Sequence, residues 1–330
     1  AYRGRETETV IRNLFDGLVT RTSEGKVVPE LAERVTQVDP TTYVAKLRRG
    51  PTFHNGAPVT VEDVVFTFQR VLNPYGVYGS PSPRRDLLGP LERVEAAGPD
   101  EVRFVLGRSF PLFPQALVHF QIVCKNAMEQ PGGKGALQSP VGTGPFRFVS
   151  GLLDKEVVME RFESYYGGSP DLPPVGPARV RRAVFRPIPH ETRRIEALGA
   201  GAAHIVQGIS PRHIEAVERT RKARVLAVKG TRSCHIELNN ARAPCNDIRA
   251  RKALSLAVDW RAVLKQVYHG FGQPLATCFL PSGFGFRSDL APTVPNADAA
   301  RRLLESAGYV VKPEMDGNRP DSTVKPPAEK

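Results

Sequence analysis

The sequence predicts an α/β fold with about two domains, from its length, its composition and the alternation of strand-like and helix-like segments. The chain has 330 residues, and a domain usually takes ~100–200 of them. Apolar residues make up 41% of it and charged residues 24%, close to the average for soluble globular proteins. These shares argue against a disordered or fibrous chain. In the second half of the chain strands and helices alternate, as they do in α/β proteins.

Two helices and several strands are predicted in the first half. Apolar side chains recur at helical spacing over 10–18 and stop before the turn-prone stretch 22–25, which predicts an amphipathic helix followed by a turn. Thr60 and Asp63 form a capping-box pattern before a second helix at 61–72, which an Asn-Pro pair ends. Alternating apolar residues predict strands at 42–47, 102–106, 146–148 and 157–159.

Short strands and helices alternate from residue 180 onward. Strands are predicted at 180–185, 204–207 and 234–238, and helices at 191–198, from Ser210-Pro211 onward, and at 246–258, 259–270 and 299–307. After Tyr309 the stretch 310–330 has four prolines and no periodicity, which predicts a disordered tail.

The net charge of +12 is spread over short clusters at 48–49, 181–182, 193–194 and 219–224. A nucleic-acid-binding protein concentrates such charge in one stripe, interleaved with aromatic residues. No such stripe is present in the sequence. We therefore expect a solvated basic surface and no nucleic-acid partner.

The four cysteines are Cys124, Cys234, Cys245 and Cys278, and none belongs to a C-x-x-C pair. Their spacing does not fit the paired ligands of a structural zinc site, so we predict no metal and no other cofactor. In an oxidising compartment Cys234 and Cys245 can form a disulfide. Buried free thiols are the alternative, and the sequence leaves both open.

No constellation of residues predicts catalysis. The Gly142-Thr143-Gly144 segment lacks the lysine and Ser/Thr of a phosphate-binding loop, which favours a tight turn. Cys234 and His235 are neighbours on a predicted strand, so they point to opposite faces and cannot form a nucleophile–base pair. The motifs G-x-S-x-G and H-E-x-x-H are absent. We therefore predict that the chain is not an enzyme and has no catalytic residues.

The longest apolar runs fall far short of the ~20 residues that a membrane-spanning helix needs, so no span is predicted. Residues 1–9 are polar and carry no hydrophobic signal region. Either export is not encoded, or a leader has been cleaved or left out, and the sequence does not separate these cases.

Seven successive stretches resemble one known family, the oligopeptide- and dipeptide-binding proteins, or bacterial extracellular solute-binding proteins of family 5. In chain order they are LFDGLV with PELA within 14–32, TY to LRRG at 42–50, FHNG with PVTVEDV within 53–64, VGTGPF at 141–146, YYGG at 165–168, NN to VD within 239–259, and ARRLL with AGY within 300–309. Each motif alone is weak. Their order over nearly all of residues 8–309 is specific.

The resemblance implies a periplasmic-binding-protein-like α/β fold (type II, peptide-binding cluster) with two lobes, the second incomplete. It implies a smaller domain at 1–143, the main domain of the first lobe at 144–239 and the start of the second lobe at 240–309. The implied function is that of the substrate-binding component of an ABC importer, for peptides or a related solute such as glutathione or a nickel chelate. The implied partners are that solute and an ABC transporter permease. The implied location is periplasmic or extracytoplasmic, with membrane association only through the permease or a lost lipid anchor.

Five residues resemble, by motif position, family positions that face the ligand cleft: Tyr75, Tyr78, Gln207, Gly208 and His235. In the family an acidic residue of the second lobe largely holds the ligand's amino terminus, and no residue of this chain has that role. Simple packing is the alternative for the two tyrosines, and an ordinary edge-of-strand histidine is the alternative for His235.

The sequence also departs from the family pattern. The family's first strand is not recognisable before residue 10, its members continue well beyond the AGY motif, and an acidic GeiDi segment is here GAAHI at 201–205. The aromatic residue of another motif is replaced by Cys245. A truncated, binding-incompetent remnant or interaction module of the same fold is therefore the alternative function. With an incomplete second lobe, helices 246–258 and 259–269 should expose apolar surface around Leu254, Val263 and Val267.

Overall fold

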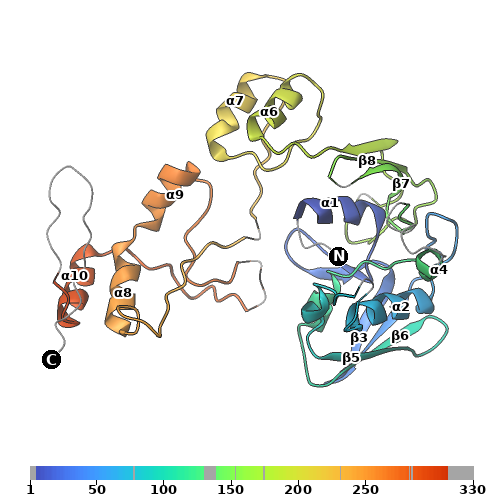
Figure 1. Cartoon of the computed structure of the whole chain (residues 1–330), viewed down its shortest axis with the longest axis horizontal. Helices are drawn as coiled ribbons and strands as arrows, with labels where there is room; N and C mark the ends of the chain where they lie inside the picture. Colours follow the sequence, from blue (N-terminus) through green and yellow to red (C-terminus); the bar gives the residue numbers. More distant parts are fainter. Residues whose placement is uncertain are drawn as a thin grey trace. The chain divides into compact units, whose positions relative to one another are not determined.

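The computed structural model describes residues 5–76, 79–129, 139–152, 154–173, 175–230, 232–281, 283 and 285–310. The chain forms two compact units, Ala1–Pro187 and Ile188–Lys330, and Figure 1 shows their elements. The expected domain boundaries after residues 143 and 239 stay predictions. The expected disordered tail lies, beyond residue 310, outside the described residues.

The larger sheet of the first unit is four-stranded and antiparallel, in the order β3-β4-β6-β5. Its strands are β3 (Ala32–Asp39), β4 (Thr42–Leu47), β5 (Leu91–Ala96) and β6 (Glu101–Leu106). The predicted strands at 42–47 and 102–106 are confirmed. They lie side by side, with Tyr43 opposite Phe104, and alternate residues of both are buried, as the apolar pattern requires.

Helix α2 (Val61–Leu72) lies beside this sheet, as Figure 1 shows. It packs on the sheet through one apolar face. The predicted capping box is present: the Thr60 hydroxyl accepts from the Asp63 amide, and the Asp63 carboxylate accepts from the Thr60 amide at 3.0 Å. The helix ends at Leu72, before the Asn73-Pro74 pair, as predicted. Short helices η1 (Arg85–Leu88), α3 (Phe113–Leu117) and α4 (Lys125–Glu129) complete this part of the unit.

Helix α1 (Arg5–Leu14) ends earlier than the sequence predicts, and the prediction of a helix through Leu18 is wrong. The amides that would continue the helix donate instead to side chains from other parts of the chain. The Asp16 amide donates to Thr143 Oγ1 at 3.0 Å, and the Gly17 amide donates to Glu30 Oε2 at 2.7 Å. Leu18 therefore enters the core from an extended segment, and the turn at 22–25 joins the hairpin β1 (Val19–Arg21) and β2 (Val27–Pro29).

A smaller antiparallel sheet, β7-β8-β9, packs against α1. Its strands are β7 (Phe146–Leu152), β8 (Glu156–Arg161) and β9 (Arg182–Phe185). The predicted strands at 146–148 and 157–159 are confirmed, and the one predicted at 180–185 begins at Arg182. The sheet and α1 enclose a second hydrophobic core of Val10, Leu14, Phe146, Val157 and Met159.

In the described part of the second unit, the regular elements are helices joined by long irregular segments. Its helices are α6 (Glu191–Gly199), η2 (Pro211–His213), α7 (Ile214–Arg219), α8 (Ile248–Ala257), α9 (Trp260–Tyr268) and α10 (Ala297–Ser306). These confirm the predicted helices. The cap of α8 is Asp247, whose carboxylate accepts from the Arg249 amide at 2.7 Å. The helix therefore begins two residues after the predicted start at 246.

The strands predicted at 204–207 and 234–238 are wrong, because the described residues of this unit contain no strand. A strand needs a neighbour to pair its backbone groups. No described residue pairs with these segments, and Ile236 of the second one is 68% exposed. The apolar alternation that predicted strands is real, but the described chain supplies no sheet for it to join.

Helices α8 and α9 expose apolar side chains, as predicted. Leu254 is 41% exposed, Val267 is 62% exposed, and Val263 is half-buried. In the part of the chain that the structure describes, none of the helices has the length and hydropathy to cross a bilayer.

Candidate functional site

The two predicted aromatic site residues lie just after α2. Tyr75 is 78% exposed, and its amide donates to Asn73 Oδ1 at 2.9 Å in a local turn. Its ring is therefore free of the packing that was the alternative interpretation. Tyr78 lies outside the described residues. Both stay predicted ligand contacts.

The three predicted site residues of the second unit lie on exposed segments without regular secondary structure. Gln207 and Gly208 are exposed, and the Gly208 carbonyl accepts from Arg194 Nη2 at 3.0 Å. His235 is exposed as well, with its Nε2 at 3.3 Å from Glu237 Oε1. No hydrogen bond or ion pair among the described residues joins Gln207 or Gly208 to His235. Their shared role in a ligand cleft therefore stays a prediction.

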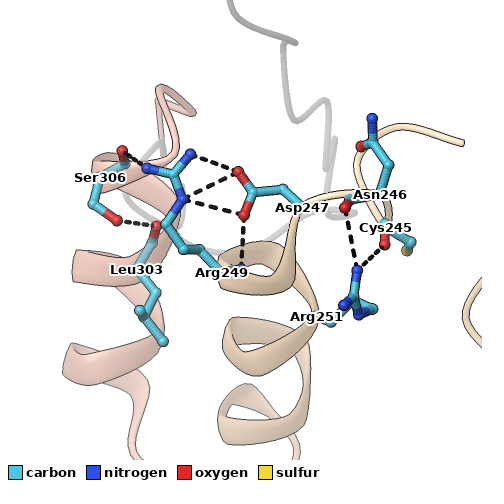
Figure 2. Close-up of polar contacts among 7 residues, drawn as sticks. All are labelled: Cys245, Asn246, Asp247, Arg249, Arg251, Leu303 and Ser306. Carbon is cyan, nitrogen blue, oxygen red and sulfur yellow. Dashed lines mark hydrogen bonds and ion pairs between the residues drawn. The ribbon is translucent and has the colours of Figure 1, made fainter. Parts of the chain in front are cut away.

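Charged residues of the NN to VD motif have a structural use, shown in Figure 2. The Arg249 guanidinium pairs with the Asp247 carboxylate at 2.6 Å and donates to the backbone carbonyl of Ser306, so it fastens α8 to α10. Arg251 donates to the Cys245 carbonyl at 2.7 Å and closes the turn before α8. The neighbouring guanidinium holds the pKa of Asp247 below its usual value. These groups are engaged within the fold, which leaves them poorly suited to hold a ligand.

Cysteines show no pairing. Cys234 and Cys245 are free, so the disulfide that the sequence permits is not formed, and Cys124 is the buried thiol. Among the residues that the structure describes, no group of three or more His, Cys, Asp or Glu side chains is placed to hold a metal ion.

A buried acidic cluster of the first unit was missed by the motif-based site prediction. It consists of Asp16 and Glu30, with Thr143, Tyr165 and Tyr166 beside Asp16. Burial raises the pKa of Asp16 well above its usual value, and the negative charge of Glu30 raises it further. Burial also raises the pKa of Glu30 to about 7, although the Gly17 amide donates to it. The only sequence signal was an acidic residue in each of two otherwise apolar motifs.

This cluster can take up protons near neutral pH. Its carboxyls titrate where ordinary carboxyls are already ionised. The tyrosines add neutral hydroxyls, because burial raises the pKa of both phenols far above the ordinary value. The arrangement supplies proton binding and polar packing but no nucleophile–base pair.

Glu30→Gln should remove a pH dependence of stability. Because the pKa of Glu30 is raised from 4.5 to about 7 in the fold, the folded protein binds the extra proton between these values. The contribution of protonated Glu30 to the free energy of unfolding is full below pH 4.5 and is lost as the pH rises through about 7. A neutral amide keeps an oxygen for the Gly17 amide. We expect the variant to be more stable than the wild type at alkaline pH, by on the order of 2 kcal/mol, in urea unfolding.

Glu33→Gln is the matched control, since Glu33 is exposed on β3 and pairs with Lys46 at the surface. It should follow the wild-type pH profile. Parallel profiles for Glu30→Gln and wild type between acid and alkaline pH would show that Glu30 ionises normally.

Comparison with known proteins places the chain in one bacterial protein family. Residues 26–325 match the model of the bacterial extracellular solute-binding proteins, family 5 middle region. The chain is 27% identical over 303 residues to heme-binding protein A of Haemophilus influenzae, covering 86% of this chain and 54% of that protein. It is 26% identical over 306 residues to the glutathione-binding protein GsiB of Pectobacterium atrosepticum, covering 92% and 57%.

A solved structure shows the same fold. The ABC transporter substrate-binding protein CtaP from Listeria monocytogenes superposes with a TM-score of 0.76 at 23% identity, covering 94% of this chain and 62% of that chain. The chain spans about half the length of the curated relatives it matches. The fold is the predicted one, periplasmic-binding-protein-like of type II in the peptide-binding cluster.

Proposed function

Because the chain belongs to family 5 of the bacterial extracellular solute-binding proteins, we propose that it is the substrate-binding component of an ABC importer. The observation that carries this is the family match over residues 26–325. The fold shared with a substrate-binding protein supports it. The proposed ligand is a peptide or a related small solute. The glutathione-binding relative, whose ligand is itself a small peptide, favours this class.

The second unit offers suitable chemistry for an extended ligand. Segments 203–209 and 232–238 have no regular secondary structure, are largely exposed and are not paired in a sheet. Free backbone amides and carbonyls can bind a peptide main chain, and neighbouring side chains then set its specificity. Gln207, Gly208 and His235 lie on these segments and are the proposed contacts. Tyr75 of the first unit is the proposed aromatic contact.

The mechanism in this family is binding without chemical change of the ligand. The proposed receptor closes two lobes on its solute and delivers it to a permease. The proposed location is outside the cytoplasm, with membrane association through the permease or a lipid anchor. Catalysis is not part of the proposal, because family members bind solutes.

Thermal unfolding with a peptide library and glutathione tests this function. A ligand that binds only the folded chain stabilises it by about 2.7 kcal/mol when present at about 100 times its Kd. His235→Ala and Gln207→Ala should each weaken that stabilisation. The exposed His190, whose side chain makes no cap hydrogen bond, provides the control His190→Ala, which should not.

A chain that stays unstabilised by every peptide and by glutathione would contradict the receptor proposal. That result would favour the alternative, an interaction module of the same fold. The exposed apolar side chains of α8 and α9 support this alternative, because exposed apolar surface is typical of interaction sites.

A further inference from the structure

The first unit contains two hydrophobic cores that meet at residues 142–144. One core lies between α2 and the four-stranded sheet and includes Phe53. The other lies between α1 and β7-β8-β9 and includes Leu14. Between them, the Gly144 amide donates to the Leu14 carbonyl at 2.9 Å, and the Asp16 amide donates to Thr143 Oγ1 at 3.0 Å.

His54 fastens this junction from the side of the first core. Its backbone amide donates to the Gly142 carbonyl at 2.8 Å. Its ring is held at both nitrogens: the Gly142 amide donates to Nδ1 at 3.2 Å, and Nε2 lies 3.0 Å from the Gly144 carbonyl. The ring also meets Phe162 edge-on, with centroids 5.1 Å apart.

These partners allow only one protonation state of the ring. An amide N–H is always a donor, so Nδ1 must be unprotonated to accept from Gly142. A carbonyl is always an acceptor, so Nε2 must carry the proton to donate to Gly144. The ring therefore has to be neutral, as the Nε2–H tautomer. A second proton can enter only at Nδ1, where it displaces the Gly142 amide.

We propose that His54 is a pH-sensitive latch between the two cores of the first unit, closed when its ring is neutral and opened by protonation at Nδ1. Opening frees the Gly142 amide and loosens residues 142–144. Those residues lead directly into β7, which belongs to the second core. Opening therefore breaks the contact that the His54 side chain makes between this core and the loop that carries Phe53. This inference rests on the geometry of the first unit and is independent of the proposed ligand.

The surroundings of the ring favour the neutral form. Burial lowers the pKa of His54 and the charge of Arg147 lowers it further, while the Gly144 carbonyl opposes them. The loop 51–58 and the segment 139–145 carry no other ionisable side chain, and Phe162 is neutral. The pKa of His54 lies below 6.5 in the fold. The hydrogen bonds of the neutral ring therefore stabilise the fold fully above pH 6.5, and this stabilisation is lost as the pH falls below 6.5.

Hydrogen exchange and NMR on the full chain test the latch. The ring nitrogens of His54 should show the Nε2–H tautomer at neutral pH. The protection of the Gly142 amide, corrected for its intrinsic exchange rate, should fall as the pH drops from 6.5 to about 5.5, by up to about fivefold. His54→Asn should abolish this pH response.

His119→Asn is the matched control, because His119 is also half-buried and its pKa is also lowered by burial. It should keep the pH response of the Gly142 amide. An Nδ1–H tautomer at His54, or a Gly142 protection factor that stays flat as the pH falls, would overturn the proposal. Both measurements on the unmodified chain decide this even if His54→Asn does not fold.

Discussion

Replacing Gly142 by alanine is expected to destabilise the first unit by about 3 kcal/mol, because the added methyl has no space. A Cβ at this position would lie 1.9 Å from the Leu14 carbonyl oxygen and 2.7 Å from the ring of Phe15. The Leu14 oxygen is backbone, and it already accepts from the Gly144 amide. It cannot rotate away, so α1 and the segment 142–144 have to separate. Urea unfolding followed by circular dichroism measures the cost.

Gly98→Ala is the control for this substitution. The nearest atom to a Cβ at Gly98 is 3.9 Å away, and this glycine is not among those with a positive φ. Its cost should stay within about 0.5 kcal/mol. If the two variants prove equally stable, α1 does not pack against residues 142–144 as described, and the proposed latch loses its setting as well.

Local signals in the sequence predicted most of the helices. The Thr60 hydroxyl and Asp63 carboxylate act within one turn, so the start of α2 was visible in four successive residues. The same holds for α9, whose Asp259 side chain accepts from the amides of Arg261 and Ala262. Such contacts depend on the nearby chain only, which is why sequence reasoning finds them. The Asn296 cap of α10 was overlooked, and that helix begins at Ala297, two residues before the predicted start.

Long-range contacts explain the errors. The helix predicted through Leu18 ends at Leu14 because the next amides are taken by Thr143 and Glu30, which lie elsewhere in the chain. The strand predicted through Ile236 has the right alternation, but no neighbour pairs with it among the described residues. Periodicity reports the preference of a segment, while its final state depends on distant partners.

The acidic cluster and the latch could not be predicted for the same reason. Asp16, Glu30 and His54 all lie in motifs that the sequence analysis marked, yet no motif shows which residues meet. His54 becomes informative only through its contacts with Gly142 and Gly144, 88 and 90 residues away. The five predicted cleft residues came from resemblance alone, and they await the binding experiment.

The largest loss of stability is expected for Phe68→Ala, at about 4 kcal/mol. The Phe68 side chain is completely buried at the centre of the first core. Its ring meets Phe104 edge-on at 5.0 Å and Phe120 at 5.5 Å, so the substitution removes two aromatic contacts and leaves a cavity. Because α2 and the sheet are both fixed by hydrogen bonds, the cavity can close only partly. Urea unfolding followed by circular dichroism gives the free energy.

Phe66→Ala is the matched test, since it removes the same side chain from the same helix, two residues away. Phe66 is half-buried, and its ring faces the Arg70 guanidinium at 5.6 Å instead of the core. Its loss should cost only about 1–2 kcal/mol, from partial burial and one cation–π contact. The difference between the unfolding free energies of the two variants measures how much more one face of α2 contributes to stability by packing on the sheet. Equal costs would mean that α2 is rotated about its axis, and the assignment of the first core would then be wrong.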